Sequence, residues 1–82
     1  MEIQIYNKET GENIGELRVR KNITHKKIIE NIKIFLAQEY NCIIRRLLPT
    51  GKIDFQTGAQ DISYVVFGEN LPFRQIYFIK SR

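Results

Sequence analysis

The sequence predicts a small α+β domain in which one helix lies across one β-sheet. Changes in hydrophobic period indicate this fold class. Residues 1–6 and 14–20 alternate between apolar and polar, residues 24–40 repeat at helical spacing, and the chain after Cys42 has strand-like patterns again. A chain of 82 residues has room for one hydrophobic core, so residues 1–82 are expected to form a single domain.

A β-hairpin is predicted at the start of the chain. Residues 2–6 and 14–20 each place apolar side chains on one face and polar ones on the other, which is typical of an antiparallel pair with one buried face. The connection between them contains Gly11, which tolerates the positive φ of a tight turn. The inward residues are Ile3, Ile5, Leu17 and Val19, and the outward residues are Gln4, Tyr6, Glu16, Arg18 and Arg20.

One amphipathic helix is predicted over about residues 24–40. Thr24 is the expected N-cap, and Asn41 is expected to end the helix in the left-handed conformation. The pattern also permits a longer helix that runs to the break at Pro49, but the β-prone residues 42–44 favour the shorter one. The stripe that faces the core consists of Ile28, Ile29, Ile32, Phe35, Leu36 and Tyr40.

Three to four further strands are predicted after the helix, at residues 43–48, 52–56, 62–67 and 74–80. Residues 62–67 are apolar on both faces, so this strand would need protection if it lay at the sheet edge. A dimer paired along it is one alternative. We expect a monomer, because Asp61 and the Gly68-Glu69-Asn70 turn bracket the strand with polar residues.

The single cysteine and the lack of a recognisable targeting or membrane segment favour a cytoplasmic protein. Cys42 is the only cysteine, so no intrachain disulfide forms and a reducing compartment is expected. No apolar run approaches the roughly 18 residues that a membrane helix needs, so no membrane partner is expected. The net charge of +4 permits an anionic partner without requiring one.

Four short strings match positions of a known fold. They are Met1-Glu2-Ile3-Gln4-Ile5 with Thr10-Gly11, Ile29-Glu30-Asn31-Ile32-Lys33, Arg46-Leu47-Leu48-Pro49-Thr50-Gly51-Lys52, and residues 76–79. On these strings the chain resembles ubiquitin and its relatives, which share the β-grasp fold. The resemblance implies a mixed sheet in which residues 14–20, 2–6, 74–80 and 43–48 lie side by side in that order.

The end of the sequence departs from this family. Ubiquitin-type modifiers and sulfur carriers end in a Gly pair, whereas this sequence ends Lys80-Ser81-Arg82. The resemblance therefore implies a ubiquitin-like module of the non-conjugated type, which acts by binding a protein partner. A small phage or mobile-element protein that binds host machinery fits this description.

The open face of the predicted sheet is the first candidate site. The implied strand order gathers apolar and aromatic residues between arginines, namely Tyr6, Leu48, Tyr77 and Ile79 with Arg18 and Arg46. Leu48 and Ile79 occupy positions that match the recognition patch of ubiquitin, with Tyr77 adjacent and Glu9 in place of an apolar loop residue. Aromatic residues and Arg commonly anchor protein partners, although an ordinary surface also carries isolated apolar residues.

The start of the helix is the second candidate site. His25, Lys26 and Lys27 occupy the first turn, where the helix dipole disfavours cations, and Arg20 and Lys21 lie just upstream. Free backbone N–H groups among these cations favour an anion site, and the alternative is a solvated basic turn. An alternative function, a small basic nucleic-acid-binding protein, is supported by the net charge of +4 and by five cations expected near one end of the sheet: Arg18, Arg20, Lys21, Lys26 and Lys27. The open sheet face would suit a single strand, with bases stacked on Tyr and phosphates met by Arg.

Catalytic signatures are absent from the sequence. His25 is the only histidine and lies on a different predicted element from Cys42, so neither a histidine-rich metal site nor a Cys-His-Asn arrangement has its parts. Asp54 and Asp61 fit solvated turn residues better than a pair of catalytic carboxylates. We therefore expect no enzymatic activity, no metal and no cofactor.

Overall fold

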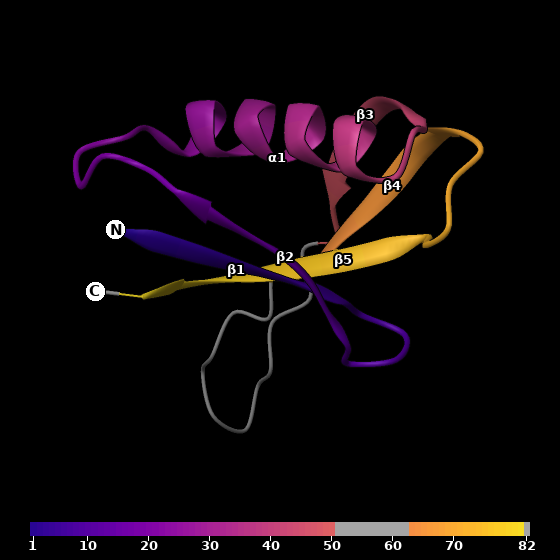
Figure 1. Ribbon diagram of the computed structural model, residues 1–82, viewed down its shortest axis with the longest axis horizontal. Coiled ribbons are helices and arrows are strands. Elements are labelled where there is room, and N and C mark those ends of the chain that lie inside the picture. The colour runs from indigo at the N-terminus through magenta and orange to yellow at the C-terminus, as the bar shows by residue number, and fades with distance from the viewer. Residues whose placement is uncertain (51–62, 82) are drawn as a thin grey trace.

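The computed structural model contains one helix packed against one face of a five-stranded sheet, and it describes residues 1–50 and 63–81 (Figure 1). The elements are β1 (Glu2–Asn7), β2 (Asn13–Arg18), α1 (His25–Glu39), β3 (Ile43–Pro49), β4 (Ser63–Glu69) and β5 (Gln75–Ser81). This order of hairpin, helix and three strands confirms the predicted fold class. The strand predicted at residues 52–56 lies outside the described residues.

The sheet has the order β2-β1-β5-β4-β3, a β-grasp-like arrangement. The prediction of a mixed sheet is wrong for the described strands, because every pairing among them is antiparallel. The reason lies in the connection after β4. Residues 70–74 join β4 to β5 as a short hairpin, and short hairpins join antiparallel strands. β4 thereby enters between β5 and β3, which the predicted order had placed side by side.

The first hairpin forms as the alternation predicts. Ile3 lies opposite Leu17, and Gly11 has the left-handed φ of 75° that the connection needs. β2 ends at Arg18 rather than at the predicted Arg20. One further pair follows β2, because Val19 and Met1 exchange backbone hydrogen bonds of 2.9 and 3.0 Å. Arg20 therefore lies beyond the sheet.

The helix has both expected ends. The hydroxyl of Thr24 accepts a hydrogen bond from the backbone N–H of Lys27 at 3.3 Å, as an N-cap residue does. Tyr40 is the C-cap, and Asn41 follows with a left-handed φ of 49°. The shorter helix is therefore confirmed, and residues 43–49 form a strand.

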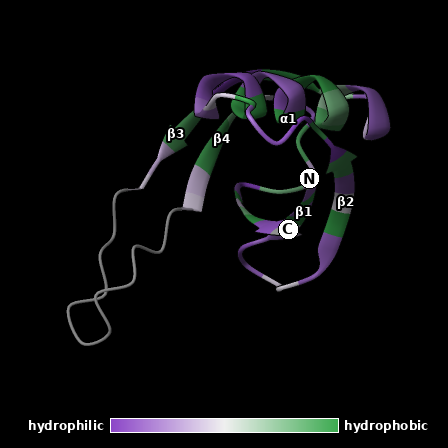
Figure 2. Cartoon of the chain, turned by 90° about the vertical axis from the view of Figure 1, so that its left-hand side faces the viewer, coloured by the Kyte–Doolittle hydropathy of each residue, from purple (hydrophilic) through white to green (hydrophobic). Residues whose placement is uncertain are grey.

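The core lies between the helix and the sheet. Figure 2 shows α1 above one face of a curved sheet, with β3 and β4 to one side and β1 and β2 to the other. The fully buried side chains come from one stripe of the helix and from the inner faces of β1 and β5: Ile3, Ile5, Ile28, Ile32, Leu36 and Ile76. Leu47, Tyr64, Val66 and Phe73 complete the buried cluster. The opposite face of the sheet carries no helix among the described elements.

The apolar strand predicted at residues 62–67 is β4, with its described part beginning at Ser63. It pairs with β3 on one side and β5 on the other. The alternative in which it forms an unprotected sheet edge is therefore wrong, because both edges of the strand are occupied.

Candidate functional site on the open sheet face

A pair of stacked tyrosines lies at the centre of the open face. Tyr6 on β1 and Tyr77 on β5 are direct cross-strand neighbours. Their ring centroids are 5.0 Å apart and their planes differ by 13°. The Nζ atom of Lys8 lies 5.6 Å from the centroid of the Tyr77 ring, a cation–π distance. Ile79, the next outward residue of β5, is 51% exposed. These four residues form the tyrosine cluster.

A second group of apolar residues lies on β3 and β4. Leu48 is opposite Val65, and Arg46 is opposite Phe67. Leu48 and Phe67 are 42% and 46% exposed. Together with Arg45 and Arg46 they line a shallow hollow of about 180 Å³. Sequence reasoning missed Phe67 as a surface residue, although the two-sided apolar pattern of its strand already showed that half of its side chains face away from the core.

The predicted alignment of Leu48 with Ile79 is wrong. The chain of pairings runs from Leu48 through Val65 to Gln75, which precedes Ile79 by four residues. Two strand spacings and four residue steps place Leu48 and Ile79 roughly 16 Å apart. The cause is β4, which separates β3 from β5. The predicted patch therefore consists of two neighbouring groups, the tyrosine cluster and the group around Leu48 and Phe67.

Arg18 and Arg46 lie near opposite edges of the sheet. Arg18 on β2 is opposite Glu2, and its guanidinium lies 3.5 Å from the carboxylate of Glu2. Arg46 on β3 has no ion-pair partner within the described ranges 1–50 and 63–81. Of the two predicted flanking arginines, Arg46 is therefore the better placed to meet an acidic group of a partner.

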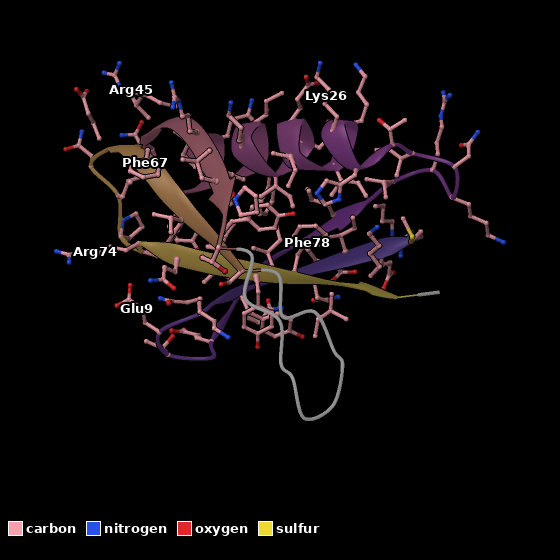
Figure 3. The ribbon with its side chains drawn as sticks, turned by 180° about the vertical axis from the view of Figure 1, so that it is seen from behind. Glu9, Lys26, Arg45, Phe67, Arg74 and Phe78 are labelled. Carbon is pink, nitrogen blue, oxygen red and sulfur yellow. The ribbon has the colours of Figure 1, made fainter. Side chains whose placement is uncertain are left out.

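The predicted anion site at the start of the helix is only partly assembled. Arg18, Arg20 and Lys27 line one groove of about 690 Å³ between the end of β2 and α1. However, the Nζ atom of Lys27 lies 3.7 Å from the carboxylate of Glu30, and this ion pair reduces the positive charge of the groove. Lys26 projects away from the sheet (Figure 3), and Lys21 does not line the groove. The predicted cluster of five cations is therefore not a single site.

His25 belongs to a different group, because its ring turns toward the sheet. Its Nε2 is hydrogen-bonded to the hydroxyl of Tyr64 at 2.7 Å, and its ring centroid lies 6.0 Å from that of Phe78. Phe78 lies between the helix and the sheet (Figure 3) and stacks on Tyr64 at 5.7 Å. Burial raises the pKa of the Tyr64 phenol above 10.0. His25 therefore fixes the first turn of the helix to β4.

The single cysteine thiol is buried in the core and is not part of a candidate site. The thiol of Cys42 is buried and donates to the carbonyl oxygen of Leu36 at 3.6 Å. Within residues 1–50 and 63–81, no cluster of His, Cys, Asp and Glu has the arrangement of a metal site. No helix in this part of the chain has the length and hydrophobicity to cross a bilayer.

Comparisons with protein-family models, curated proteins and solved structures find no match for this chain.

Proposed function

We propose that the protein is a non-enzymatic, ubiquitin-like interaction module that binds a protein partner through the open face of its sheet. The observation that carries this proposal is the tyrosine cluster on the sheet face that, among the described elements, has no helix packed against it. Tyrosine rings beside an exposed Ile79 combine apolar contact area with polar edges, as interface anchors do. Leu48 and Phe67 extend the apolar surface toward β3.

A binding face of this kind has a rigid centre. Tyr6 and Tyr77 hold each other in place by stacking, so ordering their side chains on binding costs little further entropy. Both rings are carried by adjacent strands, β1 and β5, whose opposite faces are buried under the helix. A partner then meets a surface whose shape already exists before binding.

The second candidate is a nucleic-acid-binding protein, which the groove lined by Arg18, Arg20 and Lys27 favours. Two observations weigh against it. Tyr6 and Tyr77 each cover one face of the other ring, which reduces the ring area on which a base would stack. Glu2 and Glu30 partly neutralise Arg18 and Lys27. A protein partner is therefore the better supported of the two.

Affinity capture with matched variants tests the proposal. Ile79→Glu places a charge within the tyrosine cluster, whereas Gln38→Glu makes the same change in net charge on the exposed side of the helix. Both substitutions change exposed side chains, so circular dichroism and thermal melting should show folded proteins. We expect a partner that wild type and Gln38→Glu retain and Ile79→Glu loses. Equal capture by all three proteins would contradict binding through this face.

A titration at low salt tests the nucleic-acid alternative. Fluorescently labelled single- and double-stranded DNA and RNA are titrated with the protein, and the salt concentration is then raised. Binding to phosphates weakens steeply with salt, in proportion to the number of phosphates contacted. We expect no binding at micromolar protein. Tight, salt-dependent binding that Arg20→Glu abolishes would favour the alternative.

A further inference from the structure

β3 is an edge strand of the sheet, and its outer side has no strand beside it among the described elements. The pairing pattern shows which backbone groups face outward. Val66 lies opposite Leu47 and donates its N–H to the carbonyl of Arg74 on the β5 side, at 2.8 Å. Antiparallel residues alternate between their two neighbours, so Leu47 directs its N–H and C=O away from β4. This part of the edge is available for pairing with an added strand.

Apolar hollows flank this edge on both faces of the sheet. On the helix side, Ile34, Ala37 and Ile44 line a hollow of about 330 Å³ together with Glu30 and Lys33. On the open side, Leu48 and Phe67 line the hollow already described. Alternate side chains of an added strand point to opposite faces, so they would enter these two hollows in turn.

The charges around the edge favour an acidic occupant. Arg45, Arg46 and Lys33 lie along β3 and the adjoining helix face. The guanidinium of Arg45 lies 3.0 Å from the carboxylate of Glu69 and is therefore paired. Arg46 and Lys33 have no ion-pair partner within residues 1–50 and 63–81. An extended segment with carboxylates near these cations gains both complementarity and faster association.

A second copy of this chain is a poorer occupant of the edge. Pairing β3 with β3 would bring Arg45 and Arg46 of both copies to one seam, where like charges destabilise the pairing. The register shift at Arg45 and the missing N–H of Pro49 limit regular pairing with any added strand to a short stretch around Leu47.

We propose that β3 binds an acidic, extended segment of another protein as an added strand. Main-chain hydrogen bonds to Leu47 supply part of the affinity, and the two apolar hollows with Arg46 and Lys33 supply the specificity. This site goes beyond the proposed function, because it uses the sheet edge rather than the tyrosine cluster. The two surfaces share only the group around Leu48 and Phe67.

A synthetic peptide tests this proposal on the 82-residue chain. The probe is a fluorescein-labelled Val-Ile-Val-Ile segment with Asp-Glu pairs at both ends, and its binding is measured by fluorescence anisotropy. Two further peptides carry N-methyl groups on the first or on the second set of alternate amides. A strand that pairs along one edge uses only one of these sets. We expect one methylated peptide to lose binding and the other to retain it, and a peptide with Lys in place of the acids to bind at least roughly tenfold more weakly.

Protein variants locate the site. Arg46→Glu on β3 should weaken peptide binding at least roughly tenfold, whereas Arg18→Glu on the opposite edge strand should leave it within about twofold. In ¹⁵N spectra the Leu47 amide should shift and exchange more slowly when the peptide is bound. The Ile79→Glu variant should still bind the peptide, although its tyrosine cluster is disrupted. Peptide binding therefore tests the edge site, and affinity capture with Ile79→Glu tests the proposed function separately.

Three outcomes would overturn the proposal. The first is the absence of peptide binding by wild type at millimolar concentration. The second is binding that neither N-methylated peptide alters, because main-chain pairing would then play no part. The third is a two-chain mass in sedimentation equilibrium with the Leu47 amide protected in the absence of peptide, which would assign the edge to a second copy.

Discussion

Removal of the Tyr64 hydroxyl tests how the helix is fixed to the sheet. Tyr64 is only 3% exposed, and its hydroxyl is hydrogen-bonded to Nε2 of His25 at 2.7 Å. Tyr64→Phe retains the ring that stacks on Phe78 and removes only this bond. His25 is exposed, so water replaces the lost partner, and the expected loss in free energy of unfolding is about 1 kcal/mol. For a domain of this size the melting temperature should fall by roughly 4–8 °C.

A double-mutant cycle isolates the hydrogen bond from the packing around it. Urea unfolding, followed by circular dichroism, is measured for wild type, Tyr64→Phe, His25→Ala and the double variant. His25→Ala also removes ring contacts with Phe78, so its own cost is larger than that of Tyr64→Phe. The coupling energy should be about 1 kcal/mol. A coupling energy within error of zero would refute the hydrogen bond and the placement of β4 beneath the first turn of α1.

Other substitutions and a pH titration test separate parts of the structure. Gly68→Ala should destabilise by roughly 2 kcal/mol or more in urea unfolding, because a Cβ there would overlap with the backbone carbonyl of Ile43; an unchanged midpoint would contradict this close approach. Ile76→Ala should cost about 2–5 kcal/mol, whereas Ile79→Ala should cost under about 1 kcal/mol, since the first side chain is fully buried and the second lies on the open face; equal costs would contradict the assigned faces of β5. Burial raises the pKa of Tyr64, so its neutral form favours folding below pH 10.0 and this contribution is lost as the pH rises through the raised pKa. Stability should therefore decline above pH 10.0, and the decline should be smaller in Tyr64→Phe; identical profiles would contradict the raised pKa.

Local signals in the sequence were sufficient to predict the helix and the strands that the structure describes. Thr24 caps the helix and Asn41 ends it with the expected positive φ, because both roles depend on side chains close in the sequence. The alternation in residues 2–6 correctly assigned Ile3 and Ile5 to the core and Tyr6 to the open face. These features depend on the spacing of apolar residues and on helix-capping residues, and both can be read from a single sequence.

The order and direction of the strands after the helix could not be predicted in the same way. The alternation of apolar residues indicates which face is buried but not which strand lies alongside. The resemblance to ubiquitin implied that residues 74–80 and 43–48 are neighbours, and β4 separates them instead. Consequently Leu48 and Ile79 do not form one patch, and Phe67 joins the exposed surface beside Arg46.

The orientation of His25 was also beyond local reasoning. As one of three basic residues in a first helical turn, it suggested an anion site. Its partner, Tyr64, is distant in the sequence and meets it only after β4 takes its place inside the sheet. A tertiary contact of this kind leaves no periodic signal near His25.

Site-specific photocrosslinking tests the central claim, binding of a protein partner through the open face, most directly. A benzophenone amino acid is placed at Tyr6 in the tyrosine cluster and, as the control, at Gln38 on the exposed side of the helix. Both proteins are irradiated in an extract of the source cells, and the covalent products are identified by mass spectrometry. We expect a discrete protein adduct from position 6 and none from position 38. An adduct from position 38 alone, or none from position 6 in an extract where affinity capture retains a partner, would contradict binding through the open face.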